Sequence, residues 1–305
     1  MTTEDSTSNR AATAAAAADE AATTPPQSRI RPRRVAVLYH PHVEESLVTA
    51  RQLAEMLSEH GAHPMLHDAW EWGASDDDLA GLDWVITLGG DGTVLRAVRQ
   101  TAERGIPITG VNFGRLGFLA ELEPREALRS ISDLAQGGGH IEERLMLRCR
   151  ARIGGQPYGP VDALNDIFVG RGRVAHAVRL DVSVDDVPLV RFVADGLVVA
   201  TPTGSTAYSL SAGGSVIGPG LDALMVTPVV PHPNPVRPIV LQADSCIDIW
   251  LGRGRDAILT IDGQVHEDLL EGDSVRVTVA PRRARFLRLE PASSFYDTLI
   301  ERLRR

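Results

Sequence analysis

The stretch Val85–Thr93 constrains the fold of this chain more than any other. An apolar run ends abruptly at Gly89-Gly90-Asp91-Gly92, and a helical pattern begins at Thr93. This order predicts a buried strand, a glycine turn and a helix, the unit from which parallel α/β sheets are built. Glycine lets a bulky anion approach the main chain, and the free N–H groups of a helix start attract phosphate. We therefore expect Gly90, Gly92 and Thr93 to bind phosphate.

Asp91 is the unexpected member of this turn. A carboxylate among phosphate-binding amides would repel the ligand unless it held a metal ion or took a proton during the reaction. The alternative is a simple turn in which Asp91 caps the helix and the glycines relieve strain. A motif this short leaves both interpretations open.

Length and charge narrow the class of protein. A chain of 305 residues is large for one hydrophobic core, so we expect two domains. The formal charge of −9 and pI near 5.5 argue against a general nucleic-acid binder. No apolar run approaches the roughly 20 residues that cross a bilayer. Cys149 and Cys246 form neither a CxxC pair nor a disulfide framework. We expect a soluble, cytoplasmic protein that does not bind membranes.

The basic residues exclude several mechanisms. All 31 of them are arginine, and the chain contains no lysine. It therefore cannot use the lysine of a Walker-type phosphate loop, the strand lysine of protein kinases or a Schiff-base amine. Genomic base composition explains the absence, and the exclusions hold regardless. Phosphate chemistry would have to rely on backbone amides, arginine and metal.

Residues 31–138 have the pattern of an α/β domain, preceded by an Ala-, Thr- and Ser-rich tail at 1–30 that we expect to be disordered. Apolar runs predict strands at 35–39, 64–67, 84–88 and 106–111. Apolar residues at helical spacing predict helices at 44–60, 93–104 and 122–135. The run Asp76-Asp77-Asp78 is expected in a loop before Trp84, as solvated loop charge or helix-start charge rather than as a metal site. Loops at the carboxyl ends of parallel strands line one crevice, so the Asp91 turn and Asn112–Leu119 should face the same ligand.

Beyond Gly137-Gly138-Gly139 the pattern changes to alternating. Val178–Val184 and Val275–Val279 alternate apolar and polar residues, which is typical of antiparallel strands. We predict a predominantly β domain over 139–290, with the triple glycine as hinge. A helical pattern at 291–305 predicts a final helix that returns to the first domain.

Two polar segments of the β domain could bind a ligand. Asn165-Asp166 leads into one strand, and Asp195-Gly196 into another that ends at the hydroxyl-rich segment Thr201–Ser209. Small hydroxyls suit ribose, amide or phosphate groups, and Tyr208 adds a flat face and a phenol. Each segment also has a structural explanation, as an Asx turn, a strand-entry turn or a helix cap. Together with the Asp91 turn they favour a binding site.

These segments resemble, in the same order, the signature segments of the NAD kinase family. The resemblance covers roughly residues 33–300, and its most specific part is Thr-Pro-Thr-Gly-Ser-Thr-Ala-Tyr at 201–208. Gly-Gly-Asp-Gly-Thr is shared with diacylglycerol kinases. Pro231-His232, Arg237–Val240 and Asp262-Gly263 resemble later family segments. Asp166 stands where the family usually has glutamate, one methylene longer.

The resemblance implies transfer of a phosphoryl group from ATP, or from another donor such as polyphosphate, to the adenosine-ribose 2′-hydroxyl of NAD, giving NADP. It implies Mg²⁺ or another divalent ion, Asp91 as base or orienting residue, and a homodimer or homotetramer whose subunits complete each other's sites. No metal ligand is assigned. The implied dinucleotide-binding residues are Asp91, Gly92, Phe118, Asn165, Asp166, Asp195, Thr203, Ser205, Thr206, Ala207 and Tyr208.

Two alternatives remain. A diacylglycerol or other lipid kinase would share the Asp91 turn but should carry a basic amphipathic stretch for the membrane, and the sequence has none. A non-catalytic sensor would keep the fold and bind NAD(P) without turnover, which a retained Asp91 argues against.

Overall fold

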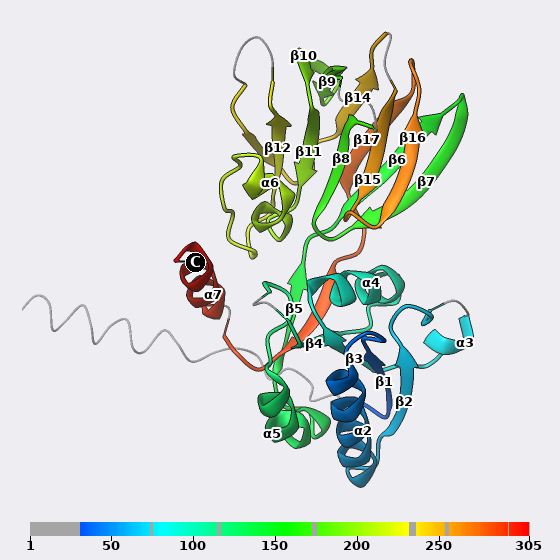
Figure 1. The fold of residues 1–305 in the computed structure, drawn as a ribbon, viewed down its shortest axis with the longest axis vertical. Coiled ribbons are helices and arrows are strands. Elements are labelled where there is room, and N and C mark those ends of the chain that lie inside the picture. Colours follow the sequence, from blue (N-terminus) through cyan, green and yellow to red (C-terminus); the bar gives the residue numbers. More distant parts are fainter. Residues whose placement is uncertain are drawn as a thin grey trace, which may run out of the picture.

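The computed structural model describes residues 31–73, 76–114, 117–172, 176–231, 236–253, 256–291 and 293–304. The predicted tail and His232 lie outside these ranges. Two layered units are stacked along the long axis, an α/β unit and a β-sandwich, and the strands β5 and β18 run between them (Figure 1).

The first unit is built on a six-stranded mixed sheet of order β2-β1-β3-β4-β18-β5. The four pairings from β2 to β18 are parallel, and the edge strand β5 pairs with β18 in antiparallel fashion. The strand bounds are β1 Arg34–Tyr39, β2 His63–Asp68, β3 Trp84–Gly89, β4 Ile108–Asn112, β18 Ala284–Arg288 and β5 His140–Arg144.

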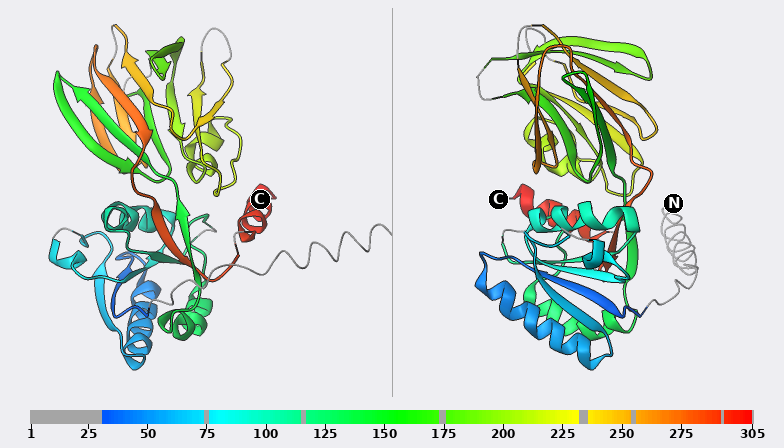
Figure 2. Two further views of the ribbon diagram at one scale, coloured as in Figure 1. Left: turned by 180° about the vertical axis from the view of Figure 1, so that it is seen from behind. Right: turned by 90° about the vertical axis from the view of Figure 1, so that its right-hand side faces the viewer.

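Helices cover both faces of this sheet (Figure 2). On β1, Ala36 and Leu38 pack with the helix α4, whereas Val35 and Val37 pack with α2 and α5. A strand buried on both faces needs a nearly continuous apolar run. β1 has one in Val35–Leu38, and that of β3 is interrupted only by the buried Thr87. The helix bounds are α2 Glu44–Glu59, α3 Asp76–Leu79, α4 Asp91–Thr101, η1 Ala102–Arg104 and α5 Pro124–Ala135.

The second unit is a sandwich of two six-stranded antiparallel sheets, of order β10-β9-β14-β17-β6-β7 and β13-β12-β11-β8-β15-β16. Its core lies between them, where alternate side chains of both sheets meet. The strand bounds are β6 Leu147–Ile153, β7 Gln156–Ala163, β8 Asp166–Arg171, β9 Val178–Val184, β10 Val187–Ala194, β11 Gly196–Ala200, β12 Ala223–Val229, β13 Ile239–Gln242, β14 Ile247–Leu251, β15 Ala257–Ile261, β16 Val265–Leu269 and β17 Ser274–Val279. Two short helices follow β11, η2 Gly204–Thr206 and α6 Tyr208–Ser211. The last helix, α7 Ser294–Leu303, follows β18.

The predicted fold class, a parallel α/β unit followed by antiparallel β structure, is confirmed. Two details differ. Asp76-Asp77-Asp78 begins the single-turn helix α3 rather than lying in a loop, so of the two expected settings, loop charge and helix-start charge, the structure has the second. The second detail is the boundary between the units, which was predicted after residue 138. The strands β5 and β18 both lie beyond that residue but belong to the first sheet, so the chain crosses to the second unit after Arg144 and returns before Ala284.

Candidate active site

Asp91 is the first residue of α4 and holds residues 117–121, hereafter the Phe118 loop, which come after β4 in the chain. Its Oδ2 accepts the Phe118 N–H at 2.9 Å, and its Oδ1 accepts those of Leu119 at 3.1 Å and Ala120 at 3.5 Å. A Cβ on Gly117 would lie 2.0 Å from Oδ1, so only glycine allows this approach. The two loops thus meet at the carboxyl edge of the sheet, as the sequence predicted.

The glycine turn leaves main chain open beside Asp91. A Cβ built on Gly90 or Gly92 would meet nothing within 4 Å, so both residues border open space at the start of α4. Thr93 is different: it is 2% exposed, and its N–H donates to the Gly90 carbonyl at 2.9 Å. Gly90 and Gly92 are therefore accessible to an anion, whereas Thr93 packs beneath the turn.

A second polar cluster forms at the end of β8 that faces the first unit. The carboxylate of Asp262 accepts the backbone N–H groups of Leu164, Asn165 and Asp166 at 2.9, 2.7 and 3.2 Å. Asp262 has a φ of 51°, in the left-handed region. From the sequence, Asp262-Gly263 was marked only by its resemblance to a family segment, because the partners of Asp262 lie almost a hundred residues earlier.

The hydroxyl-rich loop Thr201–Ser209 packs on this cluster. Thr201 Oγ1 donates to the Leu164 carbonyl at 2.6 Å and accepts the Gly204 N–H at 3.0 Å. A Cβ on Gly204 would lie 1.9 Å from the Asn165 carbonyl oxygen, so glycine is required there. Asn165 therefore lies directly against the loop.

Several predicted binding hydroxyls shape the loop itself. Ser205 Oγ donates to the Pro202 carbonyl at 2.6 Å and accepts the Ile217 N–H at 2.9 Å. Thr206 Oγ1 donates to the Thr203 carbonyl at 3.1 Å. All three hydroxyl residues, Thr203, Ser205 and Thr206, are buried, while Tyr208 is 42% exposed beside the Phe168 ring, 5.3 Å between centroids, and Ala207 is half-buried. Tyr208 and Ala207 thus form the accessible part of the loop.

Asp166 has an unusual electrostatic environment. Burial, helped by the charge of Asp262, raises the pKa of Asp166 to about 7, although the Tyr208 N–H donates to its carboxylate. Burial likewise raises the pKa of Asp262, outweighing its three backbone hydrogen bonds. The Asp166 carboxyl can therefore gain or lose a proton near neutral pH, so it can accept or donate a hydrogen bond to a hydroxyl.

A glutamine joins the two polar clusters. Gln264, in the turn between β15 and β16, donates from Nε2 to the Gly92 carbonyl at 3.0 Å, and Arg99 of α4 donates to its Oε1. The Asp91 turn and the Asp262 turn are thus in contact across the two units. Gln264 carried no sequence signal, because a single glutamine in a turn has no distinctive pattern.

Two predicted site residues lie apart from this junction. On the β8–β11 ladder Ala200 pairs with Asp166 and Gly196 with Gly170. Asp195, one residue before Gly196, therefore lies roughly 17 Å along the strand from the Asp166 end, at about 3.3 Å per residue. Even so, burial raises the pKa of Tyr208 with help from the charge of Asp195. Its charge pairs with Arg171 at 3.4 Å. The Phe118 ring packs on the final helix α7, against Phe295 at 5.8 Å, rather than on the hydroxyl-rich loop.

Comparison with known proteins matches both units. The family model described as the ATP-NAD kinase N-terminal domain matches residues 14–139, and that of the C-terminal domain matches residues 164–289. The NAD kinase of Chloroflexus aurantiacus is 39% identical over 272 residues, covering 89% of this chain and 99% of that protein. The chain belongs to the NAD kinase family.

Other relatives of the NAD kinase family agree. The NAD kinase of Symbiobacterium thermophilum is 41% identical over 267 residues, covering 85% of this chain and 94% of that protein. Yeast NADH kinase in complex with NADH superposes with a TM-score of 0.80 at 26% identity, covering 92% of each chain. An NAD kinase from Archaeoglobus fulgidus in complex with ATP gives a TM-score of 0.73 at 26% identity, covering 89% and 98%. The predicted family and enzyme class are confirmed.

Two structural properties bear on partners. Among the described residues, no helix is both long and apolar enough to cross a membrane. In the same ranges, no group of three or more His, Cys, Asp or Glu side chains is arranged to hold a metal ion.

Proposed function

We propose that this NAD kinase transfers a phosphoryl group from ATP, or from another donor such as polyphosphate, to the adenosine-ribose 2′-hydroxyl of NAD. The observation that carries the proposal is the junction at Gln264, which joins the open turn at Gly90 and Gly92 to the turn whose Asp262 holds Asn165-Asp166. A donor phosphate and an acceptor ribose would each have a binding element there. The solved relatives support both ligands, one holding NADH and the other ATP.

Asp91 and the turn would act on the phosphoryl side. The open amides of Gly90 and Gly92 and the dipole of α4 favour phosphate oxygens. Asp91 would orient or deprotonate the acceptor hydroxyl, and its three backbone hydrogen bonds hold its carboxylate in one position for that task. Thr93 would support the turn from below.

The β unit would hold the dinucleotide. Asp166, with a pKa near neutrality, suits a hydrogen bond to ribose, and Asn165 beside it offers an amide. Tyr208 and Ala207 offer an accessible face for a base. The buried hydroxyls of Thr203, Ser205 and Thr206 would keep that loop in shape.

A divalent ion fits this residue set if it arrives with the donor. Mg²⁺ is commonly held by substrate phosphates together with one or two carboxylates rather than by an all-protein cage. Asp91 would be the nearest carboxylate. When bound, the ion would neutralise charge on the donor phosphates, which a chain without lysine cannot do with an amine.

Assembly and compartment complete the proposal. The position of Asp195, away from Asp166, favours a homodimer or homotetramer in which it serves the site of a partner subunit. Both cysteines are free thiols, which suits a reducing cytoplasm.

The direct test is to incubate the purified chain with NAD, ATP and MgCl₂ and to measure NADP with an NADP-specific dehydrogenase. We expect NADP to form, to disappear with EDTA and to fall sharply in Asp91→Asn. Polyphosphate in place of ATP defines the donor. Binding of NAD without NADP formation under any donor would favour the sensor, and phosphorylation of diacylglycerol instead of NAD would favour a lipid kinase.

A further inference from the structure

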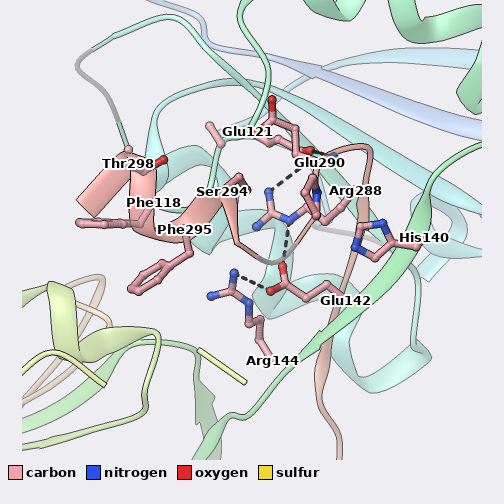
Figure 3. A pocket seen from close by; sticks show the side chains of 13 residues that line it. Phe118, Glu121, His140, Glu142, Arg144, Arg288, Glu290, Ser294, Phe295 and Thr298 are labelled. Atoms are coloured by element: carbon pink, nitrogen blue, oxygen red, sulfur yellow. Dashed lines mark hydrogen bonds and ion pairs between the residues drawn. The ribbon is translucent and has the colours of Figure 1, made fainter. Parts of the chain in front are cut away.

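Four charged side chains are buried side by side where the two units meet α7 (Figure 3). Glu142 and Arg144 come from β5, Arg288 from β18 and Glu121 from the Phe118 loop, and their side chains are only 18, 6, 8 and 8% exposed. Glu142 occupies the centre. Its Oε1 pairs with Arg144 Nη2 at 2.8 Å, and its Oε2 accepts Arg288 Nε at 3.0 Å.

Each arginine continues to a loop of the active site. Arg144 Nη1 donates to Thr203 Oγ1 at 3.3 Å, in the hydroxyl-rich loop. Arg288 Nη1 donates to the Leu119 carbonyl at 2.8 Å, and the N–H of Leu119 donates to Asp91. An unbroken series of polar contacts therefore runs from Thr203 to Asp91, and Glu142 is its midpoint.

The carboxylate of Glu142 is the only anion that contacts both guanidinium groups in the described part of the chain. Burial alone would raise its pKa, but Arg144 and Arg288 outweigh burial and lower it, so Glu142 stays ionised at neutral pH. Removing this charge would leave the buried Arg144 without its carboxylate and Arg288 with only Glu121, at 3.7 Å, which is unfavourable for two buried cations. Because a cavity of about 70 Å³ adjoins both arginines, they would have space to turn apart.

We infer that Glu142 is a positioning residue for phosphoryl transfer, setting the hydroxyl-rich loop relative to Asp91 through Arg144 and Arg288. The inference rests on the proposed function, because it concerns the distance between acceptor and Asp91. The dinucleotide contacts at Asp166 and Tyr208 are held separately, by Asp262 and by the loop's own hydrogen bonds. Glu142 should therefore affect the reaction more than the binding of NAD.

The test compares Glu142→Gln with Glu143→Gln. Glu143 is the next residue of β5, but it is exposed on the other face of the strand and contacts only Arg285, at 3.6 Å, among the ion pairs of the described residues. We expect Glu142→Gln to lower kcat by about 10- to 100-fold, the order that misplacing reacting groups produces, while the KM for NAD changes less than about threefold. Glu143→Gln should match the parent chain.

A calorimetric titration with NAD gives the number of folded binding sites in each preparation, and kcat is then expressed per site. A loss of folded protein is thereby distinguished from mispositioning of the hydroxyl-rich loop relative to Asp91. Glu142→Asp keeps the charge but is too short to reach both arginines, and its kcat should lie between the other two. If Glu142→Gln does not fold, Glu142→Asp decides by the same criterion. Unchanged kcat per site, or an increase in KM alone, overturns the inference. Failure of the parent chain to make NADP would instead overturn the proposed function.

Discussion

Replacing Asp91 by asparagine tests whether its carboxylate holds the Phe118 loop as well as serving the reaction. The carboxylate accepts two well-formed hydrogen bonds, from Phe118 at 2.9 Å and Leu119 at 3.1 Å, through different oxygens. An amide offers one oxygen and one NH₂ group, so in either orientation one backbone N–H would face a donor. A buried N–H left without an acceptor costs about 1–3 kcal/mol. At about 2–4 °C per kcal/mol, the Tm should fall by roughly 5 °C.

Turnover should fall as well, by about 10²- to 10⁴-fold if Asp91 also acts as the base. Differential scanning fluorimetry and NADP formation measure the two effects on one preparation, with Asp244→Asn, an exposed aspartate in the turn before β14, as the control. A variant with unchanged Tm would refute the loop-holding role, and one that keeps most of its activity would exclude the base. Loss of activity that saturating NAD and ATP cannot restore, together with a lower Tm, is the outcome that the structure predicts.

Three further predictions concern the acceptor side and the turn. Burial raises the pKa of Asp166 to about 7, and ribose hydroxyls favour the ionised carboxylate, so the affinity for NAD should be full above that pH and fall by up to about tenfold per pH unit below it. In calorimetric titrations at several pH values, Asp166→Asn should show an affinity that does not change with pH. A parent chain whose affinity is already independent of pH would contradict this prediction. Tyr208→Ala should raise the KM for NAD by roughly tenfold and leave the KM for ATP unchanged, since it removes an exposed ring beside Phe168. If steady-state kinetics instead showed a higher KM for ATP and an unchanged KM for NAD, the hydroxyl-rich loop would be reassigned to the donor. Gly204→Ala should lower the free energy of unfolding in urea by about 1–3 kcal/mol, because the new Cβ would lie 1.9 Å from the Asn165 carbonyl oxygen. Gly92→Ala should unfold like the parent chain and raise the KM for ATP, since a Cβ there meets nothing within 4 Å. Equal unfolding free energies for the two variants would show that the predicted clash at Gly204 is absent.

The strands that could be predicted from the sequence are those buried on both faces and those in which apolar and polar residues alternate regularly. Val35–Leu38 is a continuous apolar run, and Val85–Leu88 is interrupted only by the buried Thr87, because helices cover both faces of their sheet. The strand β7 was missed because it is an edge strand, mostly exposed, with glycine and two prolines. The strand β18 was missed because two of its five residues are arginine, and its burial depends on ion pairs with β5.

The candidate site was predictable where a local motif carries it. The Asp91 turn and the hydroxyl-rich loop have distinctive sequences, and their residues stay predictions until binding is measured. Gln264 contacts Gly92, and Glu142 joins Arg144 to the distant Arg288, so no local pattern marks either residue. Asp262 was marked only by a family resemblance, because its partners also lie far away in the chain. Glu142 and Arg144 even resemble an exposed strand face, because charged residues at alternate positions usually point to water. The pKa of Asp166 depends on burial that only the folded structure reveals.

The return of β18 to the first sheet affects how the protein is made. This strand lies between β4 and β5, so the sheet that carries Asp91 lacks an interior strand until residue 288 has been synthesised. The ribosome therefore releases almost the entire β-sandwich before the first unit can close. Contacts of such long sequence separation form slowly, because the intervening loop must be ordered first. The sandwich is completed only shortly earlier, because β17, an interior strand of one of its two sheets, ends at Val279. The sheet that carries the Asp91 turn and the sandwich therefore both acquire their last interior strand near the end of translation.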